Sequence, residues 1–275
     1  MQIRTESTGT VPVNGAELHY ERRGGGPPVL FISGATGDAG HFTAVANLLA
    51  DEFTVVTYDR RGNSRSPRPA GWVTTSPAEQ ADDAAGLLGA LGLTPAAVVG
   101  TSGGAIITLA LLLRQPEVVR GAVLHEPPLL ATLAHPEEVM AVLQPTIERG
   151  MAAGGPRGAV EAFVRFVAGD ATYERLDPGL RERMLGNGET LFGVEFGKLE
   201  VYRPADAALA AVRRPVQVLA GTESPPFLVE TSRWLAAHLN VAVGVLPGGH
   251  APYFDRPAAV AAALRPYLAA WGAAA

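Results

Sequence analysis

A serine flanked by glycines is the first feature of this sequence that could carry chemistry. The segment Gly100-Thr101-Ser102-Gly103-Gly104 follows a short apolar run and precedes a stretch with helical character. Between a strand and a helix, the pattern G-x-S-x-G is typical of a nucleophilic serine, because the glycines permit a strained turn that exposes the hydroxyl. The pattern predicts Ser102 as a nucleophile. The alternative is a glycine-rich turn in which Ser102 only caps the helix.

A serine hydroxyl is a poor nucleophile unless a base removes its proton, and the chain has six histidines. His250 is the strongest candidate, because it follows the last predicted strand and precedes the last predicted helix. The loop that carries it reaches the same edge of the sheet as Ser102. Ordinary solvated side chains are expected for His19, His41, His135 and His238.

The elements that must position these residues follow from alternating apolar and helical segments. The predicted strands are 28–32, 53–58, 96–99, 121–124, 215–219 and 241–246, and the predicted helices are 40–49, 77–91, 103–114, 228–239 and 257–271. This order predicts a mostly parallel sheet with helices on both faces. The turn Asn14-Gly15 predicts a preceding hairpin that supplies two antiparallel edge strands.

One interval lacks any strand pattern. Residues 127–206 contain only helical pieces, around 137–149, 157–168 and 180–184. This interval is too long for one crossover helix, so we interpret 127–206 as a helical cap and 1–126 with 207–275 as the core domain. Aromatic side chains of the cap could contact a hydrophobic substrate or form the cap's own core, and we offer Phe166, Phe192 and Phe196 as substrate contacts.

Composition excludes several classes of protein. The net charge is −5 and Lys198 is the only lysine, so the charge pattern of a nucleic-acid binder is missing. The absence of cysteine removes thiolate nucleophiles and cysteine-bound metals. Asp38, His41 and Asp59 lack the spacing of metal ligands, and the chemistry proposed needs no cofactor. Without a long apolar run or a signal-peptide pattern, we expect a cytoplasmic protein that inserts into no membrane.

Taken together, these motifs resemble the α/β-hydrolase superfamily over nearly the whole chain. The segment from Phe31 to Ala35 resembles the family's oxyanion strand and loop, and Asp59-Arg60-Arg61-Gly62 resembles its D-x-R-G turn. The resemblance implies an α/β-hydrolase fold, with a mostly parallel eight-stranded sheet, helices on both faces and an inserted helical cap. It also implies an oxyanion hole formed by the amide of Gly103 and an amide of the Gly34-Ala35 turn, that of Ala35.

The triad acid departs from the family pattern. Relatives usually carry an aspartate in G-x-x-D after the seventh strand, where this chain has Ser224. Two carboxylates could replace it, Glu126 at the end of the sixth strand and Glu223 beside Ser224. Adjacent residues of an extended segment point to opposite sides, so Glu223 should face away from His250. The alternative for Glu126 is a surface carboxylate before a Pro-Pro bend.

A closer resemblance favours Glu126. The segments 125–128, 222–224 and 244–253 resemble the fungal zearalenone lactonases, which use a Ser–Glu–His triad with the glutamate at this strand end. The resemblance implies a triad of Ser102, Glu126 and His250 that hydrolyses a small hydrophobic ester or lactone. A homodimer is left open. The same parts would serve a perhydrolase, a carbon–carbon bond hydrolase or a receptor-like ligand-binding protein.

Overall fold

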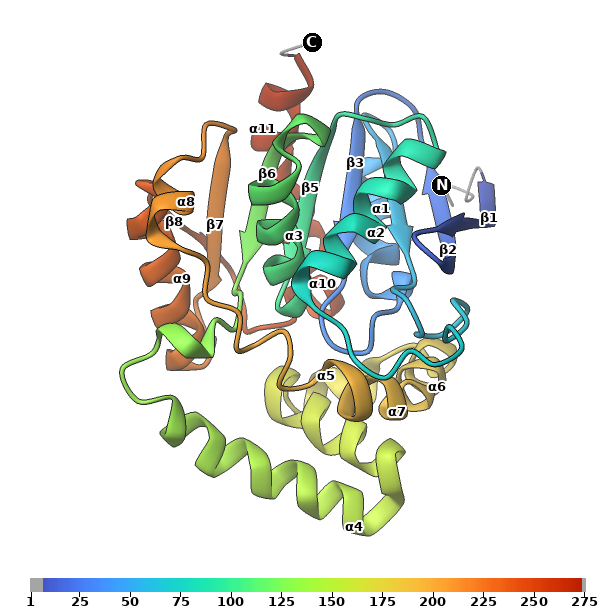
Figure 1. Cartoon of the computed structure of the whole chain (residues 1–275), viewed down its shortest axis with the longest axis vertical. Helices are drawn as coiled ribbons and strands as arrows, with labels where there is room; N and C mark the ends of the chain where they lie inside the picture. The colour runs from blue at the N-terminus through green and yellow to red at the C-terminus, as the bar shows by residue number, and fades with distance from the viewer. Residues whose placement is uncertain (1–6, 274–275) are drawn as a thin grey trace.

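Residues 7–273, which the computed structural model of the chain describes, contain an eight-stranded sheet in the order β1-β2-β4-β3-β5-β6-β7-β8 (Figure 1). The strands are β1 (Ser7–Val13), β2 (Ala16–Arg23), β3 (Pro28–Ile32), β4 (Thr54–Tyr58), β5 (Ala96–Thr101), β6 (Val119–His125), β7 (Val216–Gly221) and β8 (Val243–Leu246). Strands β3 to β8 are parallel, and the predicted fold class is confirmed. One detail is wrong: β1 lies at an edge, but β2 lies between β1 and β4 and is antiparallel to both.

Helices cover both faces of the sheet, and the pleat of the strands explains why. In β3, Leu30 and Ile32 pack on the face covered by α2 (Pro77–Ala90) and α3 (Gly103–Arg114). Val29 and Phe31 pack on the opposite face, which α1 (Thr43–Leu49) and α11 (Pro257–Ala273) cover. Both sets are buried, so the strand is a continuous apolar run. The core helices are η1 (Ala39–Phe42), α1 (Thr43–Leu49), α2 (Pro77–Ala90), α3 (Gly103–Arg114), η2 (Pro116–Val118), α8 (Asp206–Ala210), α9 (Pro226–Leu239), α10 (Pro252–Asp255) and α11 (Pro257–Ala273).

The remaining helical elements lie between β6 and α8 and gather at one end of the sheet (Figure 1). They are η3 (Leu130–Thr132), α4 (Pro136–Ala168), α5 (Asp170–Arg175), α6 (Pro178–Gly186), α7 (Gly188–Thr190) and η4 (Leu191–Glu195). Helix α4 consists of two arms that meet at Gly154 and Gly155, where the backbone is not helical. All eight strands of the sheet lie outside 127–206, and we propose this range as the cap.

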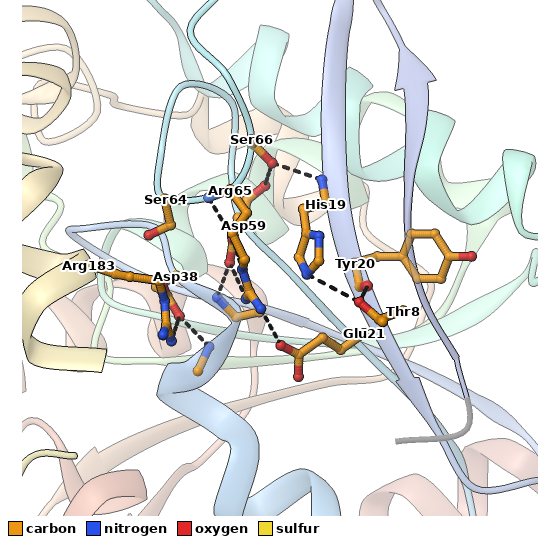
Figure 2. Close-up of polar contacts among 12 residues, drawn as sticks. Thr8, His19, Tyr20, Glu21, Asp38, Asp59, Ser64, Arg65, Ser66 and Arg183 are labelled. Carbon is orange, nitrogen blue, oxygen red and sulfur yellow. Dashed lines mark hydrogen bonds and ion pairs between the residues drawn. The ribbon is translucent and has the colours of Figure 1, made fainter. Parts of the chain in front are cut away.

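Polar contacts attach the second half of this proposed cap to the loops that follow β3 and β4. Arg183 pairs with the buried Asp38, with Nε and Oδ2 2.7 Å apart (Figure 2). The Asn187 amide donates to the carbonyl oxygen of Thr36 at 2.7 Å, and the Thr190 hydroxyl donates to that of Gly62 at 2.6 Å. These contacts therefore fix the later helices of the proposed cap to the rest of the fold.

The acidic residues of this region are occupied by neighbouring donors. Asp59 accepts the backbone N–H of Ala39 at 2.8 Å and pairs with Arg65 at 2.7 Å (Figure 2).

Among residues 7–273, no three histidine or acidic side chains are grouped as metal ligands would be. Within the same part of the chain, no helix has the length and apolar character that crossing a bilayer requires.

Candidate active site

The turn after β5 gives Ser102 a strained backbone. Its φ of 54° and ψ of −127° lie outside the regions that most side chains adopt, and α3 begins at the next residue. The neighbouring glycines are required here: a Cβ at Gly100 would overlap the carbonyl oxygen of Gly104, and one at Gly104 would overlap that of Ile32. Because strand, turn and helix pack so closely here, the serine side chain projects away from their backbones.

The loop after β3 passes directly against this serine. A Cβ on Gly34 would lie 2.8 Å from the Cβ of Ser102 and 3.3 Å from its Oγ, so only glycine permits the approach. Ala35 and Gly103 line the same cavity as Ser102. Gly103 is the first residue of α3, where backbone N–H groups have no acceptor within the helix. The residues predicted to supply the amides of an oxyanion hole thus lie around the serine.

Strand register explains how Glu126 comes close to the serine turn. Thr101 of β5 pairs with His125 of β6, and the N–H of Ser102 donates to the carbonyl oxygen of His125 at 2.9 Å. The residue that follows β6, Glu126, therefore leaves the sheet beside Ser102. Its positive φ of 48° is unusual for a residue other than glycine and marks a local strain of the kind that gathers at functional sites.

Glu126 and His250 form a buried pair. The Nδ1 atom of His250 lies 2.6 Å from Oε2 of Glu126, and Oε1 accepts the N–H of Gly221 at 2.7 Å. Burial would raise the pKa of Glu126, but the hydrogen bond and charge of His250 lower it to about 2. A carboxylate held this way fixes the imidazole with Nδ1 as donor, which leaves Nε2 to accept a proton. His250 lines the same cavity as Ser102.

The other candidate acid lies apart from this pair. Glu223 is exposed and pairs with Arg256, with Oε1 and Nη2 3.1 Å apart. Its carboxylate therefore points toward the surface, as the alternation of an extended segment predicts.

A second buried histidine adjoins the pair, and sequence reasoning gave it no role. The Nδ1 atom of His125 lies 2.9 Å from the hydroxyl of Thr101, and its ring stacks on His250 with the centroids 6.0 Å apart. His41 is also buried, although a solvated side chain was expected; it packs against Tyr253 and Phe254. Burial lowers the pKa of both His41 and His125 to about 4. No signal besides its position beside Glu126 could have pointed to His125.

These two histidines predict that the fold is sensitive to mild acid. Their pKa values lie near 4 when folded and near 6.5 when unfolded, so the unfolded chain binds more protons between these limits. Stability is therefore complete above about pH 6.5 and falls as the pH drops toward 4, by roughly 1.4 kcal/mol per pH unit for each histidine. Urea unfolding at pH 7 and pH 5 measures this loss.

A matched pair of variants isolates the contribution of one ring. Between pH 7 and pH 5, the free energy of unfolding of His41→Asn should fall by about 2 kcal/mol less than that of the wild type, since the titrating group is gone. His135→Asn serves as the control, because the His135 side chain is 68% exposed, and it should follow the wild type. Parallel pH dependence in all three proteins would contradict the assignment.

The cavity that contains Ser102 and His250 has a volume of about 380 Å³, and most of the side chains that line it are apolar. Of the three predicted substrate contacts, Phe166 and Phe196 line it. Phe192 is not among the lining residues and packs against Phe163 and Phe196, with ring centroids 6.3 and 5.8 Å away. The lining also includes three charged residues that sequence reasoning did not select, Arg60, Glu195 and Glu200. Burial raises the pKa of Glu200 to about 7.

Comparison with known proteins agrees with this architecture. A hydrolase of Bacillus subtilis named YraK, of uncharacterized function, is 34% identical over 254 residues, covering 90% of this chain and 91% of that protein. A zearalenone hydrolase from Bionectria ochroleuca is 29% identical over 269 residues, covering 93% and 94% of the two chains. A thermophilic esterase from Thermogutta terrifontis superposes with a TM-score of 0.79 at 24% identity, covering 97% and 99%. The sequence profile of the alpha/beta hydrolase family matches residues 29–263, and the chain belongs to this family.

Proposed function

We propose that this hydrolase cleaves an ester or lactone bond through an acyl-enzyme on Ser102. The observation that carries the proposal is the 2.6 Å hydrogen bond between the buried Glu126 and His250, beside a cavity that also exposes a serine on a strained turn. In such a pair, the carboxylate orients the imidazole and stabilises the positive charge that the imidazole gains when it takes a proton from the serine. The relatives named as zearalenone hydrolases support a lactone among the substrates.

The reaction proceeds in two halves. The Nε2 atom of His250 takes the proton of the Ser102 hydroxyl while Oγ bonds to the carbonyl carbon, and the carbonyl oxygen becomes an oxyanion. The N–H groups of Ala35 and Gly103 donate to that oxygen, each stabilising the transition state by roughly 3 kcal/mol. His250 then returns the proton to the departing alkoxide. In the second half, water bonds to the acyl carbon while the same histidine takes its proton, and the histidine then passes this proton to Oγ of Ser102 as the acid product departs.

The lining of the cavity supports a hydrophobic substrate of moderate size. Leucine, valine, methionine, proline and phenylalanine side chains form most of its wall, and about 380 Å³ suits a ligand of drug size. The polar side chains on the wall are those of Ser102 and His250 and of the charged residues Arg60, Glu195 and Glu200. A substrate that fits this surface carries one reactive carbonyl on an otherwise largely apolar body.

A substrate screen tests the proposal. The wild type and Ser102→Ala are incubated with p-nitrophenyl acetate and butyrate, with small lactones and with macrocyclic lactones, and products are followed by absorbance and chromatography. We expect the wild type to hydrolyse at least one class and the variant to hydrolyse none above background. Equal turnover by both proteins would remove Ser102 from the reaction. Tight binding of these compounds by the wild type without turnover would indicate a receptor-like protein instead.

A further inference from the structure

One arginine joins the proposed cap to the loop beside Ser102. Arg60 lies in the turn after β4, is 1% exposed, and donates from Nη1 and Nη2 to the two carboxylate oxygens of Glu195 at 2.7 and 2.8 Å. Glu195 ends η4 and is also 1% exposed. The amide of Gln80 and that of Asn63 donate to the same carboxylate at 3.3 and 3.1 Å. The pair is thus bidentate, buried and supported on both sides.

The guanidinium also holds the oxyanion loop. The Nη2 atom of Arg60 donates to the carbonyl oxygen of Gly34 at 2.8 Å, and the N–H of Gly37 donates to the same oxygen at 3.1 Å. That carbonyl belongs to the peptide unit whose N–H is that of Ala35. Because a trans peptide is planar, with its C=O and N–H pointing in opposite directions, fixing the oxygen fixes the direction of the Ala35 N–H. A cation on the oxygen also polarises the unit and strengthens its N–H as a donor.

We propose that Arg60 is a positioning residue for the oxyanion hole and that Glu195, contributed by the cap, holds Arg60 in place. This rests on the proposed function of Ser102. Packing of the later cap helices against the core then also places Glu195 against Arg60, and so helps to position the N–H group that stabilises the transition state. Substrate selection by the cap and turnover at the serine are thereby linked through one ion pair.

The neighbouring arginine provides a matched comparison. Arg61 is 4% exposed and pairs with Asp83, with Nη2 and Oδ1 2.6 Å apart. It also donates to the carbonyl oxygen of Asn14 at 2.8 Å, at the β1–β2 turn. In the family's D-x-R-G pattern, Arg61 occupies the arginine position and Arg60 the variable one. Both arginines form buried ion pairs, but the contacts of Arg61 lead to the hairpin and α2, not to the loop beside Ser102.

The experiment compares Arg60→Met, Glu195→Gln and Arg61→Met with the wild type. It measures kcat and KM on p-nitrophenyl butyrate, the rate at which a fluorophosphonate labels Ser102, and Tm. We expect Arg60→Met to lower kcat and the labelling rate by about 10² with KM changed less than threefold, as when one oxyanion donor is misplaced. Glu195→Gln keeps the shape of the side chain and should lower both by about tenfold. Arg61→Met should lower Tm but keep kcat within threefold.

Two further readouts decide the interpretation. If Glu195 acts only through Arg60, the double variant Arg60→Met/Glu195→Gln should have the same kcat and labelling rate as Arg60→Met alone, so the two effects should not add. The proposal would be overturned if Arg60→Met kept the kcat of the wild type, or if Arg61→Met lost as much kcat as Arg60→Met. If Arg60→Met does not fold, Glu195→Gln decides: a kcat equal to that of the wild type would overturn the proposal. A different result would overturn the proposed function itself: the wild type would then neither hydrolyse the ester nor be labelled at Ser102.

Discussion

Ser102→Ala is expected to lower kcat by roughly 10³ or more while the protein stays folded. The substitution removes only the hydroxyl that would form the acyl-enzyme, and nucleophile and base act as a unit, so losing either removes most of the rate. Alanine has the same Cβ as serine and imposes no new clash on the strained turn at φ 54°. The circular dichroism spectrum and Tm should therefore remain close to those of the wild type.

His250→Ala should lose activity to a similar degree but should also lose stability. Glu126 is fully buried and its pKa is held near 2 mainly by His250, so the variant leaves a buried carboxylate without its partner. Urea unfolding of the two variants distinguishes these effects. If His250→Ala retains near-normal turnover, this histidine is not the base.

Covalent labelling tests the nucleophile independently of any natural substrate. A fluorophosphonate should modify the wild type at Ser102, identified by peptide mass spectrometry, and should leave Ser102→Ala unmodified. Modification of another serine would contradict the assignment of the turn after β5.

The fold could be predicted largely because its signals are local. Strands buried on both faces appear as short apolar runs, and β3 spans the predicted residues 28–32. Helix α2 begins at Pro77, the first residue of the predicted helix 77–91, and the hydroxyl of Ser76 caps it by accepting the N–H of Glu79 at 3.1 Å. The pattern around Ser102 is local as well, since Gly100 and Gly104 lie within two residues of the serine, although the contact that requires Gly104 is with β3.

The parts that sequence reasoning missed depend on tertiary contacts. Arg60 and Glu195 are 135 residues apart, and neither position carries a pattern that predicts their pairing. His41 was expected in solvent because nothing in the sequence around it predicts which distant segment packs on it, yet α10 covers it with Tyr253 and Phe254. The position of Phe192 could not be predicted either, because the sequences of the helical segments in 127–206 do not specify which of these segments contact one another.

The second large effect concerns the acid. Glu126→Ala should lower kcat by roughly 10² to 10⁴, as expected when a catalytic histidine loses the carboxylate that orients it. Glu223→Ala should change kcat less than about tenfold, because this exposed side chain pairs with Arg256 and not with His250. The two glutamates belong to different loops of the same sheet edge, so each variant controls for the other. Steady-state kinetics on one activated ester measures both.

Restoring the usual family pattern gives a sharper test of the same assignment. Ser224 follows Glu223 by one residue and lies against Gly221, whose N–H donates to Glu126. An aspartate at this position extends toward the space that the Glu126 carboxylate vacates, so Ser224→Asp in the Glu126→Ala background should recover part of the lost activity. Glu223→Asp in the same background is the matched control and should recover none, since that side chain points toward solvent. A crippling Glu223→Ala with a mild Glu126→Ala would show instead that the acid follows β7, and the likeness to zearalenone hydrolases would then lose its support at the site.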